Sequence, residues 1–281
     1  MVEVFGRTNT SVPELWFSLI APSSETEAEA TAQAARESGA ILDVSPALAR
    51  WGHEFRGQDV RLLSFGGLDY ERSIDETHAY DLTSAHLIET LSSLGRSEIE
   101  FFFLRVRRAV EEFQINGALG ALASAKQDGL VGHVGLYVEG PALAVSGVWR
   151  FHDAFECVMA RRNPRFESDF RMIEALATER RVGLVSCQPF QWGRGLSIAW
   201  LPGDPFRSSA YLASLREEHP VMLGVRSAAE IEFALEANAS PQALPVDALA
   251  AFDDPATWRD CADDPRPWVR ETVREAWHAP V

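Results

Sequence analysis

Short apolar segments alternate with helical patterns over most of this chain, and that alternation limits the folds it can form. The expected strands are continuous apolar runs at positions 12–20, 40–44, 60–65, 99–106, 131–138, 155–160, 182–187 and 220–225. Such runs are typical of parallel strands that are buried on both faces and connected by helices. Eight strand–helix repeats fit a closed (β/α)8 barrel, the TIM barrel, better than an open sheet. We therefore expect one α/β domain over 1–281, with a C-terminal extension from about residue 240.

Capping residues predict where several of the helices begin and end. Ser24 and Glu27 form a capping box, and Gly39 ends the helix that they start. A further helix is expected over 84–94, where leucines recur on one face, and Asn116 is the expected N-cap of the next one.

Charge and composition exclude several classes of function. The chain has 26 basic and 41 acidic residues and a net charge of -15, which disfavours binding to nucleic acid. It has no apolar run of about 18 residues and no secretory signal, so we expect a cytoplasmic protein with no membrane partner. The three cysteines are far apart and no metal-ligand spacing occurs, so no metal site is expected. The oligomeric state stays open.

In a barrel of this kind, functional side chains lie at the C-terminal ends of the strands. Those ends carry a set of polar, charged and sulfur-containing residues: Ser18, Asp43, Ser64, Arg105, Tyr137, Met159, Cys187, Gln188 and Arg226. Trp192, in the loop after the seventh strand, could form an apolar wall of the same site.

Two groups of arginines follow the fourth and sixth expected strands. They are Arg105, Arg107 and Arg108 in the first group, and Arg161, Arg162 and Arg165 in the second. Arginine forks match carboxylate and phosphate groups, so these residues could bind an anionic substrate. The alternative is that they are solvated loop charges paired with nearby glutamates.

Several segments in the right order resemble the aldo/keto reductases, which are NADPH-dependent (β/α)8 barrels. They are VFGRT at 4–8, SGAILD at 38–43, LSSLGRSEIE at 91–100, ALGALASAKQDGLVGHVG at 118–135, VGLVSCQP at 182–189 and GVRSAAEI at 224–231. The resemblance covers nearly the whole chain. It implies the barrel fold and a catalytic tetrad of Asp, Tyr, Lys and His.

Only the aspartate of that tetrad is matched. Asp43 stands at its position, whereas Leu48, Ser64 and Arg105 stand where the family has Tyr, Lys and His. Leucine has no exchangeable proton, and arginine is a permanent cation that donates a proton poorly. The only lysine, Lys126, falls at the end of a helix on the opposite face of the expected barrel.

The positions that would bind the nicotinamide also differ. Tyr137 and Met159 replace polar residues that hold its carboxamide in the family, and Cys187 replaces the tyrosine that stacks on it. Arg226 and Ser227 still fit the phosphate-binding part of the pattern. We expect no cofactor, and NADPH bound partly by Arg226 and Ser227 is the alternative.

These departures predict a non-redox enzyme, of the cyclase, dehydratase or isomerase type, acting on a small metabolite that could be anionic. Without the lysine, Asp43 is expected to pair with Arg105. The catalytic candidates are Asp43, Arg105 and Tyr137. The candidates for binding substrate are Ser18, Leu48, Ser64, Met159, Arg161, Cys187, Gln188 and Trp192. A divergent NADPH-dependent oxidoreductase and a non-catalytic binding barrel are the alternatives.

Overall fold

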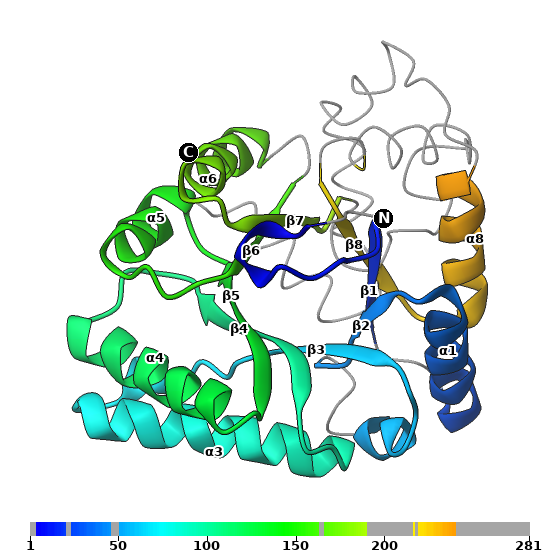
Figure 1. Cartoon of the computed structure of the whole chain (residues 1–281), viewed down its shortest axis with the longest axis horizontal. Coiled ribbons are helices and arrows are strands. Elements are labelled where there is room, and N and C mark those ends of the chain that lie inside the picture. Colours follow the sequence, from blue (N-terminus) through cyan, green and yellow to red (C-terminus); the bar gives the residue numbers. More distant parts are fainter. Residues whose placement is uncertain are drawn as a thin grey trace, which may run out of the picture.

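The computed structural model describes residues 4–20, 24–45, 51–162, 166–189, 216 and 219–239. Within them, eight parallel strands close into a barrel in sequence order, β1 to β8, as Figure 1 shows. The strands are Leu15–Leu19 (β1), Ile41–Asp43 (β2), Arg61–Phe65 (β3), Ile99–Val106 (β4), Val131–Val138 (β5), Cys157–Arg161 (β6), Gly183–Cys187 (β7) and Val221–Val225 (β8). The expected (β/α)8 barrel is confirmed. The expected extension from residue 240 lies outside the described residues.

Helices surround the barrel. They are Glu25–Ser38 (α1), Glu76–Leu94 (α3), Glu112–Gln127 (α4), Ala142–Phe151 (α5), Glu167–Arg180 (α6) and Ala228–Ala239 (α8). In Figure 1, α3 and α4 lie side by side below the barrel, and α1 packs beside α8. No helix in this part of the chain is long and apolar enough to cross a membrane.

The helix ends follow local capping chemistry, with one wrong prediction. Ser24 caps α1 by accepting from the Glu27 amide at 3.2 Å, as expected. Asn116, however, lies inside α4 and is not its N-cap. The helix begins at Glu112, five residues earlier than that prediction, because the Gln114 side chain accepts from the Glu111 amide at 3.0 Å. Likewise α3 begins at Glu76 rather than 84, because Asp75 accepts from the His78 amide at 2.8 Å.

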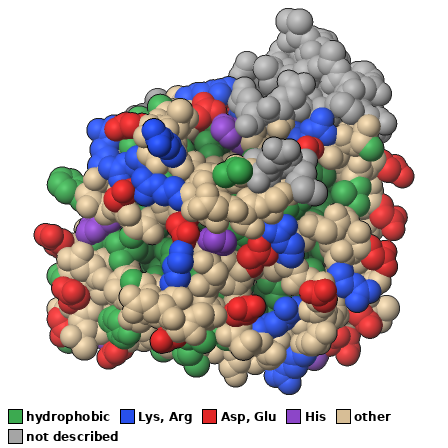
Figure 2. Space-filling view, viewed as in Figure 1, with side chains coloured by type: hydrophobic (Ala, Val, Ile, Leu, Met, Phe, Trp, Pro, Cys, Tyr) green, Lys and Arg blue, Asp and Glu red, His purple; other side chains and the backbone are tan. Residues whose placement is uncertain are grey.

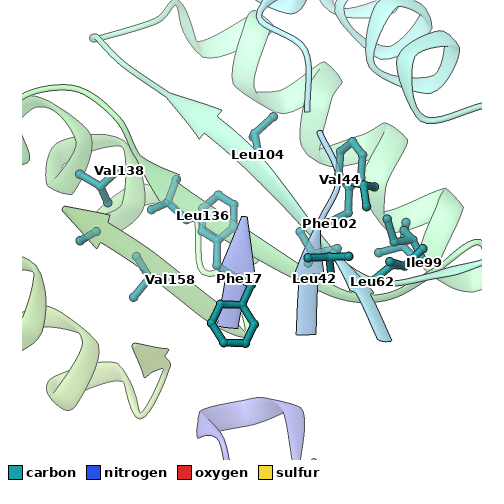
Figure 3. Close-up of a cluster of buried hydrophobic side chains, with 14 of the residues drawn as sticks. Phe17, Leu42, Val44, Leu62, Ile99, Phe102, Leu104, Leu136, Val138 and Val158 are labelled. Atoms are coloured by element: carbon teal, nitrogen blue, oxygen red, sulfur yellow. The ribbon is translucent and has the colours of Figure 1, made fainter. Parts of the chain in front are cut away.

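Alternation along the strands divides the core into two layers. Leu42, Phe102 and Leu136 face outward and pack in the layer between strands and helices (Figure 3). Phe101 and Phe103 flank Phe102 and lie instead in the cluster that fills the barrel interior. This filling makes the barrel a packed core rather than a pore, so a ligand has room only at a rim.

Lys126 lies at the N-terminal end of the barrel, away from the rim that was expected to hold the site. It lies in the last turn of α4 and forms an ion pair with Glu156, which immediately precedes β6. Burial alone would raise the pKa of Glu156, but hydrogen bonds from His133, Lys126 and the Val134 amide lower that pKa to about 2. On the face drawn in Figure 2, acidic and basic side chains lie among one another over the described residues.

Candidate functional site

A cavity of about 310 Å³ opens at the C-terminal ends of the strands. Its lining combines polar side chains with apolar ones and three glycines: Ser18, Ile20, Asp43, Ser45, Ser64, Phe65, Gly66, Gly67, His86, Arg105, Tyr137, Gln188, Met222 and Gly224. Six of the residues expected at the rim therefore share one cavity: Ser18, Asp43, Ser64, Arg105, Tyr137 and Gln188.

Asp43 is held by neutral hydrogen-bond donors. Its Oδ2 accepts from the Ser18 hydroxyl at 2.6 Å, and its Oδ1 accepts from the Ser45 amide at 2.9 Å. The Ser45 hydroxyl accepts from the Phe65 amide at 2.8 Å and lies 3.1 Å from the Ser64 hydroxyl. Because β1, β2 and β3 are neighbours in register, these bonds join three adjacent strand ends into one network.

The Asp43 carboxyl has an unusually high pKa for an aspartate. Burial raises this pKa to about 6, although hydrogen bonds from Ser18 and Ser45 and the charge of Arg105 oppose the rise. A carboxyl with a pKa of about 6 can both take up and give back a proton near neutral pH. Asp43 is therefore suited to general acid–base chemistry on a ligand in the cavity.

Arg105 does not form the expected ion pair with Asp43. Its Nε and Nη2 donate to the two carboxylate oxygens of Glu139, at 2.9 Å and 2.6 Å. Arg105 stands beside Tyr137 in the register of β4 and β5, and Glu139 follows Tyr137 by two residues. Glu139 is therefore near enough to form a bidentate ion pair with Arg105. This pair holds the guanidinium at the cavity and balances its charge.

Tyr137 stays protonated and can act as a hydrogen-bond donor. Burial, together with the nearby Cys187 and Glu139, raises the pKa of Tyr137 well above its ordinary value. Its hydroxyl oxygen accepts from Gln188 Nε2 at 2.7 Å. That bond positions the hydroxyl at the cavity wall, where its proton can be donated to a ligand or to Cys187, whose pKa a hydrogen bond with Tyr137 lowers.

Other residues expected to bind substrate do not line the cavity. Met159 and Cys187 are fully buried in the barrel interior, and burial raises the pKa of the Cys187 thiol to about 12. Arg161 places its guanidinium 4.2 Å from the centre of the Phe166 ring. Leu48 and Trp192, like Arg165, lie outside the described residues.

Three arginines of the two predicted groups form ion pairs with glutamates. Arg107 and Arg108 both contact Glu71, at 3.1 Å and 3.0 Å, and the Glu71 side chain is fully buried. Arg162 contacts Glu167 at 3.4 Å. These pairs agree with the interpretation of the arginines as charges balanced by glutamates.

Arg226, the expected phosphate ligand, is bound by Glu230 in the first turn of the following helix, α8. Its Nε donates to Glu230 Oε1 at 3.0 Å, and its backbone N–H donates to Glu230 Oε2 at 2.8 Å. The Glu230 carboxylate thus accepts from both groups of Arg226 that would donate to a phosphate. Its negative charge would also repel a phosphate. The described residues around Arg226 and Ser227 therefore do not fit an NADPH phosphate.

Three residues at or beside the cavity were missed by sequence reasoning: Ser45, His86 and Glu139. Ser45 and Glu139 lie two residues beyond Asp43 and Tyr137, so a search extended past each strand end would have included them. His86 lies on α3, and no sequence pattern indicates that this helix reaches the cavity. Outside the cavity, Glu25, His53 and Glu54 place their ligand atoms within 4.8 Å of one another, in a largely exposed acidic group.

Comparison with known proteins shows a likeness in structure. No protein-family model and no curated protein matches the sequence. A proposed aldo-keto reductase from Pseudomonas aeruginosa is 21% identical with a TM-score of 0.61, covering 83% of this chain and 93% of its own. An aldo-keto reductase from Bacillus halodurans, in its holo form, is 15% identical with a TM-score of 0.64, covering 89% and 94%.

A third solved structure agrees. It is an aldo-keto reductase from a Medee basin deep-sea metagenome library, 12% identical with a TM-score of 0.65, covering 89% of this chain and 93% of its own. At these identities the likeness concerns the fold. The chain has the (β/α)8 barrel fold of the aldo/keto reductases.

Proposed function

We propose that this barrel is a non-redox enzyme that moves protons on a small carbonyl or hydroxycarbonyl compound held in the cavity. The observation that carries the proposal is Asp43, a buried carboxyl with a pKa of about 6 that lines the cavity. Buried groups with strongly shifted pKa values in a cavity are typical of catalytic acids and bases. Isomerases and dehydratases use this chemistry.

The proposed step is removal of a proton from the carbon next to a carbonyl group. Asp43 accepts the proton, the C–H electron pair forms a C=C bond, and the carbonyl π pair moves to its oxygen. The Tyr137 hydroxyl and the Arg105 guanidinium would stabilise the negative charge that develops on that oxygen. Return of the proton to the same carbon or a neighbouring one completes an exchange or an isomerisation.

The described residues support a reaction without NADPH. Glu230 binds Arg226, the expected phosphate ligand, and the sequence resemblance places Ser64 and Arg105 where the family has lysine and histidine. The proposed reaction therefore includes no hydride step. The expectation of an anionic substrate also loses support, because Glu139 balances the charge of Arg105 at the cavity.

The second candidate is a divergent NADPH-dependent reductase. The names of the structural neighbours favour it, since they are called aldo-keto reductases. The two candidates differ in what they require: a reductase consumes NADPH, whereas the proposed enzyme acts on its compound with no added cofactor.

Deuterium exchange tests the proposal and does not require the natural substrate. The full chain is incubated in D2O with a panel of α-hydroxyaldehydes and α-hydroxyketones, and loss of the C–H signal next to the carbonyl is followed by NMR. We expect exchange of at least one compound, and Asp43→Asn should slow it by about a hundredfold or more. Asp153→Asn is the matched control, because Asp153 is an exposed partner of Arg7 and Arg180.

Two results would contradict the proposal. One is a panel that shows no enzyme-dependent exchange. The other is exchange that Asp43→Asn leaves at the wild-type rate. Oxidation of NADPH by the protein together with any panel compound would support the reductase instead.

A further inference from the structure

His86 reaches the cavity from α3, which lies outside the barrel. Its Nε2 lies 3.2 Å from the carbonyl oxygen of Phe65, and the ring packs against Phe102 with 6.3 Å between ring centres. A carbonyl oxygen can only accept, so Nε2 must carry the proton in this bond. In the neutral imidazole, Nδ1 then has a lone pair, and no other described residue is hydrogen-bonded to it.

Gly67 lies beside this nitrogen and leaves room for the ring. A Cβ atom at Gly67 would lie 2.9 Å from His86 Nδ1 and 3.2 Å from its Cγ, so any side chain there would push the ring aside. Gly67 lines the cavity next to His86. The lack of a side chain at Gly67 therefore lets the ring, with its unused Nδ1, sit at the cavity wall.

We propose that His86 is a second proton-transfer residue, acting through Nδ1 in the cavity that Asp43 also lines. This rests on the proposed function. In its protonated form His86 gives the Nδ1 proton to the carbonyl oxygen while Asp43 takes the proton from the neighbouring carbon. The products are the enol, a protonated Asp43 and a neutral His86, so charge and protons balance. The reverse transfers complete the reaction.

The first test measures the tautomer and needs no substrate. Two-bond 1H–15N spectra of the full chain, labelled with 15N-histidine, report which imidazole nitrogen carries the proton. The His86 signal is identified by its loss in His86→Gln. We expect the Nε2–H tautomer in neutral His86, and a changed His86 signal in Gly67→Ala. An Nδ1–H tautomer would overturn the proposal, whatever the reaction.

The second test uses the exchange assay. A glutamine at position 86 can still donate to the Phe65 carbonyl but cannot titrate, so His86→Gln separates anchoring from proton transfer. We expect the maximal exchange rate to fall by about a hundredfold, with KM changed by less than about threefold. The limb of the pH profile that is due to Asp43 should remain in His86→Gln. The other groups facing the cavity, Tyr137 and the Arg105–Glu139 pair, are present in both proteins.

Chemical rescue gives a second readout that a structural role would not produce. In His86→Ala, added imidazole should restore part of the lost rate. His152→Gln, a substitution at the C-terminal cap of α5, is the control and should leave the rate unchanged.

The outcomes separate the two proposals. Exchange by the wild type that His86→Gln leaves unchanged would overturn the role of His86 alone. Exchange by no protein in the series would overturn the proposed function, and with it the role of His86. A loss in His86→Gln that comes entirely through KM would show a binding role, and would also contradict the proposal.

Discussion

At the scale of residues, the site depends on a buried carboxylate that has no cationic partner in direct contact among the described residues. Asp43 is held by Ser18 and Ser45, while Arg105, which also lines the cavity, is bound by Glu139. Neutral donors satisfy the oxygens of a carboxylate without cancelling its charge. The desolvation cost therefore remains, and it keeps the pKa of Asp43 near the pH at which proton transfer is useful.

The raised pKa of Asp43 predicts a pH-dependent cost to stability. The folded protein binds the proton more tightly than the unfolded chain, so stability should fall as pH rises from about 4 through about 6. Asp43→Asn removes this slope, and above pH 7 it should be more stable than the wild type by up to about 3 kcal/mol. Urea unfolding at several pH values measures the difference. An equal slope in both proteins would contradict the burial of the charge.

Ser18 is predicted to set the position of the acid limb of the exchange reaction. Its hydrogen bond lowers the pKa of Asp43, so Ser18→Ala should raise that pKa and move the acid limb to higher pH. Ser146→Ala is the matched control, because the Ser146 hydroxyl bonds to its own helix at the Leu143 carbonyl. An acid limb that does not move in Ser18→Ala would mean that Asp43 is not the titrating base.

At the scale of elements, strands were easier to predict than helix starts. Continuous apolar runs such as that around Phe101 occur because both faces of each strand are buried. The start of α4 depends instead on Gln114, which bonds to the Glu111 amide and also donates to the Glu71 carbonyl at 2.9 Å. That second contact spans 43 positions, so the capping pattern of α4 alone could not predict it.

Close packing of α3 on α4 predicts opposite effects for two glycines of the same helix. A Cβ at Gly117 would lie 2.2 Å from the Glu76 carbonyl oxygen, whereas one at Gly120 would make an ordinary 3.5 Å contact with Tyr80. Gly117→Ala should therefore destabilise the fold by about 2–3 kcal/mol. Gly120→Ala should stabilise it by about 0.5–1 kcal/mol, because alanine favours helix. Thermal or urea unfolding tests both; equal effects would contradict this helix packing.

At the scale of the whole molecule, the barrel and part of its site could be predicted from the sequence. Strand order places Asp43, Arg105 and Tyr137 at one rim, and the structure brings them to one cavity. The partners of those residues could not be predicted. Arg105 pairs with Glu139 and not with Asp43, and His86 reaches the cavity from a helix outside the barrel. Both facts depend on distances between residues far apart in the sequence, which a local sequence pattern does not contain.

The single lysine belongs to the opposite end of the molecule from the cavity. Lys126 pairs with Glu156 below β6, so its substitution should not affect chemistry at the rim. Lys126→Arg is expected to exchange deuterium at the wild-type rate. A loss of exchange in Lys126→Arg, with the fold intact by circular dichroism, would contradict the assignment of function to this cavity.

The central claim is that a reductase-like barrel works here without a nicotinamide cofactor. Calorimetric titration of the full chain with NADPH tests it most directly, with Glu230→Gln alongside because that substitution frees Arg226 from its carboxylate. We predict no saturable binding to the wild type at micromolar NADPH. Saturable binding of NADPH to the wild type in that range would contradict the claim.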